Sequence, residues 1–217
     1  MLSQCRSILM LGAHPDDIEC GLGGTWFQHL NPNSHRRNDR AKYAVFSSTS
    51  ECPTNRNIRQ ELRQSIRMLG LTNDDCLLFD HPWMQLQQHR GTIRQQIWGM
   101  KETLHPDLVF IPSIHDQHQD HQVVAQEAYR IFRCQQAILL GYEISRSIES
   151  FQPTLYVSLS PAAVEAKQNL LAIYRSQQEH EYMHQEAVEA VMRVHGLHAS
   201  CKPHRFAEAF EVYKIVL

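Results

Sequence analysis

Short apolar runs alternate along the first two thirds of this chain with segments in which apolar residues recur every three to four positions. The first pattern predicts buried strands and the second predicts amphipathic helices. The strands are expected at 7–12, 43–46, 76–79 and 108–111, and the helices at 21–30, 58–69, 92–104 and 122–132. This alternation predicts an α/β fold with a largely parallel sheet flanked by helices.

The last third of the chain follows a different pattern. Apolar runs predict strands at 138–140 and 155–159, helical spacing follows over 161–174 and 178–194, and alternation predicts a closing strand at 209–216. These elements predict a mixed C-terminal portion of the sheet. No linker, internal repeat or low-complexity tract interrupts the sequence, so one domain is expected over 1–217.

Composition narrows the class of partner. The formal net charge is -2 over 217 residues, which gives no basic field for nucleic acid. No apolar run approaches the ~20 residues of a membrane span. The short apolar stretch near the N-terminus is interpreted as a core strand and not as a signal peptide, which predicts a cytoplasmic protein. The assembly state stays open, with a homo-oligomer as one alternative.

Six cysteines are scattered through the chain without any C-x-x-C spacing. This distribution argues against a zinc site made of thiolates and against a disulfide framework. Candidate chemistry therefore has to come from other side chains.

Two clusters of histidine and aspartate each follow a predicted strand. The first reads Ala-His-Pro-Asp-Asp at 13–17, and the second reads His-Asp-Gln-His-Gln-Asp-His at 115–121. An open parallel sheet binds its ligands outside the carboxyl ends of its strands. If the two strands end side by side, both clusters meet at one edge of the sheet.

Such a meeting would place a metal site between the clusters. A catalytic zinc usually has three protein ligands and an open position for water. We expect His14, Asp17 and His121 to be the ligands, with Asp16 as a general base beside the water. The same set also suits iron(II), so the residue types alone leave the metal open. Pro15 restricts the backbone of this loop and stiffens it.

Neighbouring polar residues are given supporting roles. We expect His118 on the substrate side, where in its protonated form it would stabilise an oxyanion or give a proton to a leaving amine. Asp120 is expected to orient an imidazole. Glu19 is an alternative metal ligand, but its place in a first helical turn favours a helix cap or a substrate contact.

These residues resemble the PIG-L/LmbE family of zinc-dependent N-acetylglucosaminyl deacetylases. The first cluster, together with Glu19 and the Gly-Leu-Gly-Gly of 21–24, is similar to the first motif of the family, and the His-Gln-Asp-His of 118–121 is similar to the second. Less specific similarities extend over nearly the whole chain, at 106–110, 141–143, Lys167, 174–177 and 207–210.

The resemblance implies a Rossmann-like fold and a zinc ion held by His14, Asp17 and His121. It further implies that Asp16 is the general base and that His118 acts on the oxyanion or the leaving group. The implied reaction removes an acetyl group from the nitrogen of an amino sugar, which is often attached to a larger group.

Two further residues are candidates for substrate binding. The family often has a sugar-contacting arginine shortly before a glutamate on the helix after the second strand. Arg56 and Arg59 both precede Glu61 without matching that register squarely, and we prefer Arg59. Trp83 follows the third predicted strand and would either stack on a sugar ring or pack in the core.

The sequence therefore predicts a zinc-dependent hydrolase that removes the N-acetyl group from an amino sugar or sugar conjugate. Its expected partner is a small molecule and not a nucleic acid. Two alternatives stay open: a metal-dependent hydrolase of a different amide, and a non-catalytic sugar-binding protein on the same fold. The sequence does not name the sugar, the group attached to it or the pathway.

Overall fold

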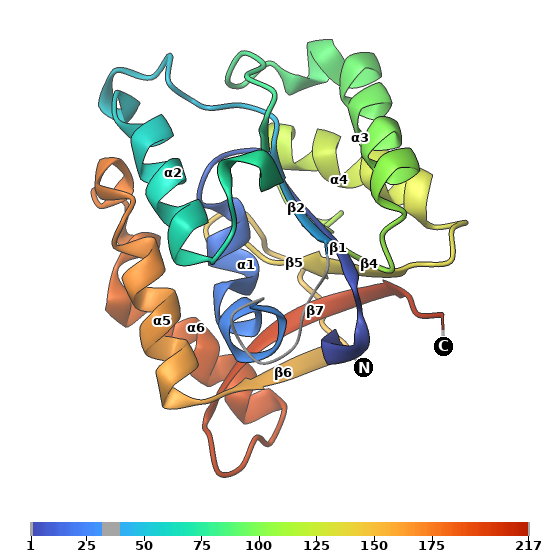
Figure 1. Cartoon of the computed structure of the whole chain (residues 1–217). Coiled ribbons are helices and arrows are strands. Elements are labelled where there is room, and N and C mark those ends of the chain that lie inside the picture. Colours follow the sequence, from blue (N-terminus) through green and yellow to red (C-terminus); the bar gives the residue numbers. More distant parts are fainter. Residues whose placement is uncertain (1, 32–39, 217) are drawn as a thin grey trace.

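A twisted sheet forms the centre of the molecule (Figure 1). The structure is a computed structural model that describes residues 2–31 and 40–216. Within these residues, the seven-stranded sheet has the order β3-β2-β1-β4-β5-β7-β6. The strands are β1 (Ser7–Gly12), β2 (Arg40–Val45), β3 (Cys76–Leu78), β4 (Leu108–Pro112), β5 (Ile138–Tyr142), β6 (Leu155–Leu159) and β7 (Phe206–Lys214). Strands β1 to β5 are parallel, whereas β7 pairs antiparallel with both β5 and β6.

Helices cover both faces of this sheet. They are α1 (Asp17–Thr25), α2 (Ile58–Met68), α3 (Arg90–Leu104), α4 (Gln119–Phe132), α5 (Pro161–Leu171) and α6 (Gln185–His198). Helices α1, α2, α5 and α6 lie on one face, and α3 and α4 lie on the other (Figure 1). Their apolar side chains form two separate cores with the sheet. Shorter helical turns complete the chain, one π turn at Trp26–Leu30 and 3₁₀ turns at Leu2–Gln4, Pro53–Asn55, Asn73–Asp75, Leu86–His89, Arg175–Gln177 and Glu181–Met183.

Strand β1 shows how one apolar run serves two cores. Ile8 and Met10 belong to the core under α1 and α2, and Leu9 and Leu11 belong to the core under α3 and α4. Successive side chains of a strand point to opposite faces, and a strand covered on both sides is apolar at nearly every position. The unbroken apolar run at 8–11 is thus the signature of a central strand.

The predicted fold class is confirmed, including the mixed C-terminal portion. Some boundaries differ. The first helix begins at Asp17 and not at Gly21, and the closing strand begins at Phe206 and not at residue 209. The helix expected over 178–194 is replaced by a 3₁₀ turn followed by α6, because His180 and His184 have extended backbone conformations.

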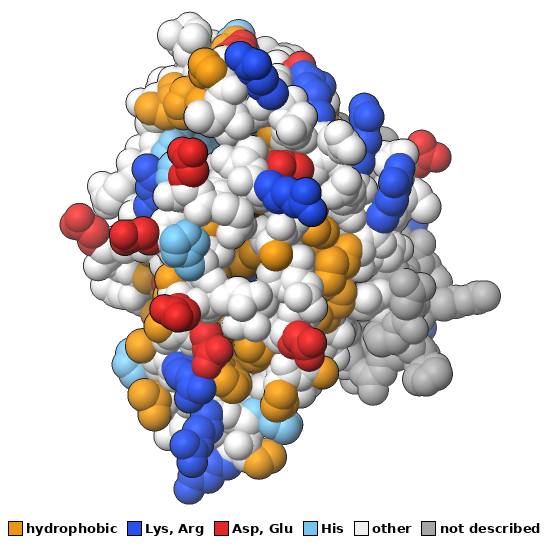
Figure 2. Space-filling model, turned by 90° about the vertical axis from the view of Figure 1, so that its left-hand side faces the viewer, with side chains coloured by type: hydrophobic (Ala, Val, Ile, Leu, Met, Phe, Trp, Pro, Cys, Tyr) orange, Lys and Arg blue, Asp and Glu red, His pale blue; other side chains and the backbone are white. Residues whose placement is uncertain are grey.

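The outer surface carries charges of both signs. Figure 2 looks onto the side that carries α2 and α5, where acidic and basic side chains are interspersed. That face therefore offers no broad field of a single sign. Over 2–31 and 40–216, no helix combines the length and the apolar composition that a membrane crossing needs.

Candidate metal centre and active site

The two clusters meet where β1 and β4 end. These strands are direct neighbours and run parallel, with Ile8 opposite Leu108, so their following loops leave the same edge of the sheet. The loop after β1 enters α1, and the loop after β4 enters α4. The expectation that distant segments converge at one edge is confirmed.

Three ligand-capable atoms face one another at this edge. His14 Nδ1 lies 3.2 Å from His121 Nε2, His121 Nε2 lies 3.3 Å from Asp17 Oδ1, and Asp17 Oδ1 lies 3.8 Å from His14 Nδ1. A tetrahedral zinc ion with bonds of about 2.0–2.1 Å keeps its ligand atoms about 3.3 Å apart. The donor types and their spacing therefore fit one divalent cation. All three residues are buried.

A hydrogen-bonded loop fixes the carboxylate of Asp17. Its Oδ2 accepts the backbone N–H groups of Ala13 (2.8 Å) and His14 (2.9 Å). Oδ1 is left to face the imidazoles. Burial alone would raise the pKa of Asp17, but the charge and hydrogen bond of His121 hold that pKa well below its usual range. Asp17 is thus ionised, as a metal ligand must be.

Each histidine is oriented by a second carboxylate. His14 Nε2 lies 3.1 Å from Asp120 Oδ2, and His121 Nδ1 lies 3.0 Å from Asp116 Oδ2. A metal-bound histidine commonly donates its other ring N–H in this way, which fixes the tautomer. Asp120 thus lies where we expected an orienting residue. Asp116 belongs to the same arrangement and was missed, although its place in the second cluster was a signal.

The carboxylates around His121 favour positive charge there. Burial opposes the charged form, yet Asp17 and Asp116 raise the pKa of His121 to about 10. Metal binding would replace that bound proton with a cation.

His118 lies beside the proposed ligands, but its ring nitrogen Nδ1 is hydrogen-bonded to the backbone and not to a carboxylate. Its ring stacks on His121 at 4.4 Å and meets the ring of His14 edge-on at 4.9 Å. His14, His118 and His121 also form a geometric cluster that a metal ion could occupy. However, His118 Nδ1 accepts the backbone N–H of Asp120 at the start of α4. The proton of the neutral ring then belongs on Nε2, which favours Asp17 over His118 as the third ligand.

The charge expected for His118 needs correction. Burial, followed by the nearby His121 and His14, lowers the pKa of His118 to about 4. The ring is therefore neutral near pH 7 and not protonated as we expected. A neutral imidazole still donates one hydrogen bond through Nε2–H.

Asp16 differs from every other carboxylate in the site. Its backbone is left-handed, with φ of 98°, a conformation that non-glycine residues rarely adopt. The residue is 6% exposed and lines the cavity. Among the described residues, none donates a hydrogen bond to its side chain. Burial, with the charges of Asp17 and Glu19, raises the pKa of Asp16 well above its usual range.

A cavity of about 580 Å³ opens beside these residues. Such a volume lies within the usual range for small-molecule sites. Trp83 and Met84 contribute apolar side chains to its wall, at 38% and 45% exposure. Trp83 therefore lines the cavity and is not part of the core. Its contact with a sugar stays a prediction.

Glu19 does not reach the cavity, and our expectation of a cap, ligand or substrate contact is corrected. The residue is completely buried. Its carboxylate accepts hydrogen bonds from the hydroxyl groups of Tyr43 and Tyr174, each at 2.7 Å, and from Ser65. These donors satisfy the carboxylate inside the core and leave it no role toward a ligand.

Arg59 also lies outside the cavity, which corrects its expected role in substrate binding. Its guanidinium pairs with Asp80, and its side chain is 43% exposed. The arginine that does line the cavity is Arg146, on the segment after β5. No motif marked Arg146 in the sequence. The available signal was that Arg146 follows β5, the strand that pairs with β4, and that the second cluster follows β4.

Fold and site together define an α/β protein with a candidate hydrolytic metal centre at the carboxyl ends of its parallel strands. The PIG-L family, described as GlcNAc-PI de-N-acetylase, matches residues 9–132, which is more than half of the chain and includes both clusters. The chain belongs to the PIG-L family, and the resemblance that we noted from the sequence is confirmed.

Individual relatives agree with this assignment. The chain is 28% identical over 179 residues to the uncharacterized deacetylase YaiS of Escherichia coli (strain K12), covering 79% of this chain and 91% of that protein. The N,N′-diacetylchitobiose deacetylase from Pyrococcus horikoshii superposes with a TM-score of 0.73 at 17% identity. The superposition covers 97% of this chain and 85% of the deacetylase chain. The 4-carboxy-2-hydroxymuconate hydratase GalB from Pseudomonas putida KT2440 superposes with a TM-score of 0.70 at 16% identity, covering 98% of each chain. At these identities the two structures show a common fold only.

Proposed function

We propose that this protein is a metal-dependent hydrolase that removes the N-acetyl group from an amino sugar or a sugar conjugate. The observation that carries the proposal is the triangle of His14 Nδ1, Asp17 Oδ1 and His121 Nε2 with the unpartnered carboxyl group of Asp16 beside it. Membership of the PIG-L family supports the same reaction, as does the similarity to two deacetylases, YaiS and the chitobiose enzyme.

His14, Asp17 and His121 would hold the metal ion. We propose zinc because the family resemblance favours it, with iron(II) as the alternative for this donor set. When bound, the ion acts as a Lewis acid that lowers the pKa of water and polarises a carbonyl group. Asp116 and Asp120 would keep the two imidazoles in the tautomers that face the ion.

Asp16 and His118 would carry out the proton transfers and charge stabilisation. Asp16 would accept a proton from the water that attacks the acetamide carbon. The proton then passes from Asp16 to the leaving nitrogen, which releases acetate and a free amine. His118, which lines the cavity, would donate a hydrogen bond from Nε2–H to the carbonyl oxygen as that oxygen becomes negative.

The rest of the cavity would bind the sugar. Its volume of about 580 Å³ accommodates a monosaccharide together with an attached group. The indole of Trp83 would stack on the apolar face of the sugar ring. This assignment replaces Arg59 and Glu19 with residues that line the cavity.

The test compares metal content and turnover in two variants. We expect Asp16→Ala to keep its metal but to lose roughly 10²–10⁴-fold in turnover, the usual contribution of a general base. His14→Ala should lose the metal itself. Metal is measured by elemental analysis, and acetate and free amine are measured with a panel of N-acetylated glycosides, nucleotide sugars and lipid-linked sugars.

The outcomes separate the alternatives. Full activity in both variants would contradict the assigned roles. Turnover of other amides but of no N-acetylated sugar would show a hydrolase of a different amide. Sugar binding without turnover in the metal-loaded protein would show a binding protein. GalB shows that this fold also supports a hydratase, so acetate release is the decisive measurement.

A further inference from the structure

A row of arginines follows the exposed side of α2. Arg59, Arg63 and Arg67 are spaced by four residues and are all exposed, so they lie on one face of the helix. Like charges at this spacing repel one another and destabilise a helix. Arg59 pairs with Asp80, but the ion pairs in the described part of the chain include neither Arg63 nor Arg67. Two of the three guanidinium groups therefore have no carboxylate partner within that part.

A groove of about 510 Å³ lies between α2 and β3. Its polar lining consists of the three arginines and Asn73. Its apolar lining comes from both elements and consists of Leu62, Ile66, Cys76 and Leu78. The groove therefore combines a row of cations with an apolar surface that reaches the strand.

Strand β3 is the last strand on its side of the sheet. It pairs with β2, and among the described strands none pairs with its other edge. The pairing continues beyond the strand, because the N–H of Phe79 donates to the carbonyl of Val45 (2.9 Å). Residues 76–79 read Cys-Leu-Leu-Phe, are all half-buried, and include no charge and no proline. Charges and prolines usually protect a free edge, so this edge keeps backbone groups that can pair with a further strand.

The arginine row and the strand run alongside each other in opposite directions. Arg59, near the start of α2, pairs with Asp80, which follows β3. Arg67, near the end of α2, lines the groove together with Asn73, which precedes β3. A helix rises about 6 Å over four residues, and alternate residues of a strand lie about 6.6–6.8 Å apart on the same face. A strand added to β3 would therefore bring every second side chain opposite one arginine of the row.

We propose that the free edge of β3 and the arginine row of α2 together bind an extended acidic segment of a partner protein. The segment would add a strand to the sheet, and carboxylates at its alternate positions would pair with the guanidinium groups. The inference goes beyond the proposed reaction and does not depend on it.

Other occupants match these features less well. A second copy of this chain would present the same patch to itself, which would bring two rows of arginines together. A nucleic acid would leave the backbone of β3 unpaired and would meet a chain with a net charge of -2. The row is also local, because acidic side chains are interspersed with basic ones over the wider face that Figure 2 shows.

The test measures how the full chain binds two labelled peptides of the same composition. One hexapeptide alternates glutamate and valine, and the other has three glutamates followed by three valines. Fluorescence anisotropy at low ionic strength should give a Kd at least about fivefold lower for the alternating peptide, because only alternation places three carboxylates on one face of a strand. The double variant Arg63→Met/Arg67→Met should weaken binding of the alternating peptide by about tenfold, since an exposed ion pair contributes up to about fivefold.

Two controls separate the arginine row from the strand edge. Arg193→Met removes an exposed arginine of α6 and should leave the affinity for the alternating peptide unchanged. N-methylation of the peptide tests the backbone pairing, because alternate residues of a strand direct their N–H groups to opposite edges. Methylation of one alternate set should abolish binding, and methylation of the other set should be tolerated.

Several results would overturn the proposal. They are equal affinities for the two peptides, equal effects of the two methylation patterns, and unchanged binding by a double variant that circular dichroism shows to be folded. Tighter binding of a single-stranded oligonucleotide than of the alternating peptide would assign the groove to nucleic acid instead. Self-association in sedimentation velocity that Arg63→Met/Arg67→Met abolishes would assign it to a second copy.

The outcome is independent of the proposed hydrolysis. Acetate release from the N-acetylated sugars should be the same with and without the alternating peptide, because the groove does not share lining residues with the cavity of the metal centre. Peptide binding without hydrolysis would refute the hydrolase alone, and hydrolysis without peptide binding would refute the docking surface alone.

Discussion

At the scale of single residues, the site depends on which nitrogen of each histidine faces the proposed metal. His14 presents Nδ1 and His121 presents Nε2, and the opposite nitrogens lie against Asp120 and Asp116. The sequence identifies histidines as ligands but not their tautomers, because the orienting carboxylates act through tertiary contacts. Asp120 was predicted to orient an imidazole, but that it orients His14, and that Asp116 orients His121, follows only from the convergence of the two loops.

The left-handed backbone of Asp16 leads to a prediction about stability. A left-handed conformation costs a non-glycine residue roughly 1–2 kcal/mol, and strain of this kind is often kept for function. We expect Asp16→Gly to be about 1 kcal/mol more stable to unfolding than Asp16→Ala in metal-free protein, because glycine adopts positive φ freely. Urea denaturation followed by circular dichroism measures both values.

Both Asp16 variants lack the carboxylate, so the difference between them reports the backbone alone. Both should show the same roughly 10²–10⁴-fold loss of turnover. A glycine variant no more stable than the alanine variant would show that φ of 98° stores no strain.

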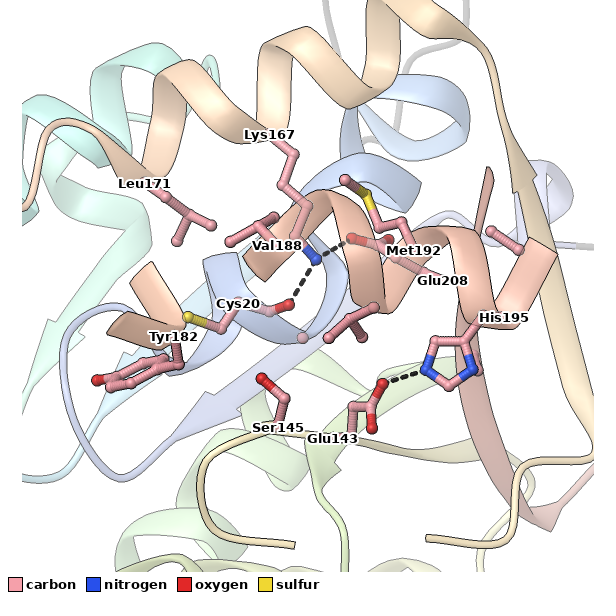
Figure 3. A pocket seen from close by; sticks show the side chains of 14 residues that line it. Cys20, Glu143, Ser145, Lys167, Leu171, Tyr182, Val188, Met192, His195 and Glu208 are labelled. Atoms are coloured by element: carbon pink, nitrogen blue, oxygen red, sulfur yellow. Dashed lines mark hydrogen bonds and ion pairs between the residues drawn. The ribbon is translucent and has the colours of Figure 1, made fainter. Parts of the chain in front are cut away.

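At the scale of elements, α1 is held by a buried ion pair from two distant elements. Lys167 Nζ of α5 donates to the carbonyl of Cys20 (2.5 Å) and to Glu208 Oε1 of β7 (2.7 Å). Glu208 in turn accepts the N–H groups of Gly24 (2.9 Å) and Thr25 (2.6 Å). The pair thus contacts backbone groups in the middle and at the end of α1, the helix that begins at Asp17; Figure 3 shows the bonds from Lys167 to Cys20 and Glu208.

Removal of one partner should destabilise the fold strongly. Lys167→Met leaves Glu208 as a buried charge without its counter-ion, and we expect a loss of roughly 3–5 kcal/mol in the free energy of unfolding. Arg193→Met, which breaks the exposed pair with Glu189 on α6, should cost less than about 1 kcal/mol. Similar losses in urea denaturation of the two variants would contradict the importance of burial.

The elements also show what could be predicted from the sequence. Apolar runs located the strands, because a strand buried on both faces must be apolar throughout. The start of α1 was misplaced because Gly21 and Gly24 were interpreted as opening the helix. In the structure both lie inside α1, after its first turn, and an added Cβ would clash with Tyr142 or Leu159. Their smallness serves packing between elements, which local spacing does not reveal.

The residues of the candidate site likewise fall into those that could be predicted from the sequence and those that could not. The proposed ligands and Asp16 are close in sequence within two motifs, so their residue types and spacing were sufficient to find them. Arg146 was missed and Arg59 preferred, because the position of a lone arginine depends on which loop the sheet topology brings to the cavity. The 3₁₀ turns that carry Gln177 and Tyr182 to the cavity were missed for the same reason.

At the scale of the whole molecule, the site lies where the order of the strands reverses. The chain builds β2 and β3 on one side of β1, and then β4 and β5 on the other. The loops that follow β1 and β4 consequently diverge to opposite faces, toward α1 and α4 (Figure 1). Ligand sites of open α/β sheets form at this switch point, which explains why the two clusters meet there and not elsewhere.

A further prediction concerns how the stability of the whole molecule depends on pH. It rests on the sheet face covered by α3 and α4, opposite the face covered by α1. The buried carboxylate of Glu127 on α4 pairs with Arg90 and Arg94 of α3 and with Arg130. Burial would raise the pKa of Glu127, but hydrogen bonds from Arg94 and Arg90 hold it below its usual range. A carboxylate with a lowered folded-state pKa stabilises the protein above its unfolded pKa, and this stabilisation is lost as the pH falls through the folded value.

Glu127→Gln should therefore reduce the stability more near neutral pH than at an acid pH below the lowered folded-state pKa of Glu127, where the wild-type carboxyl group is protonated as well. The free energy of unfolding of the variant should consequently change less between these two pH values than that of wild-type protein. Glu165→Gln, which removes the charge of an exposed carboxylate on α5, should leave the wild-type pH profile nearly unchanged. Parallel profiles for wild type and Glu127→Gln would show that the arginines of α3 do not hold α4 through this charge, and that the packing of Ile93 and Ile97 against the core shared with α4 is sufficient.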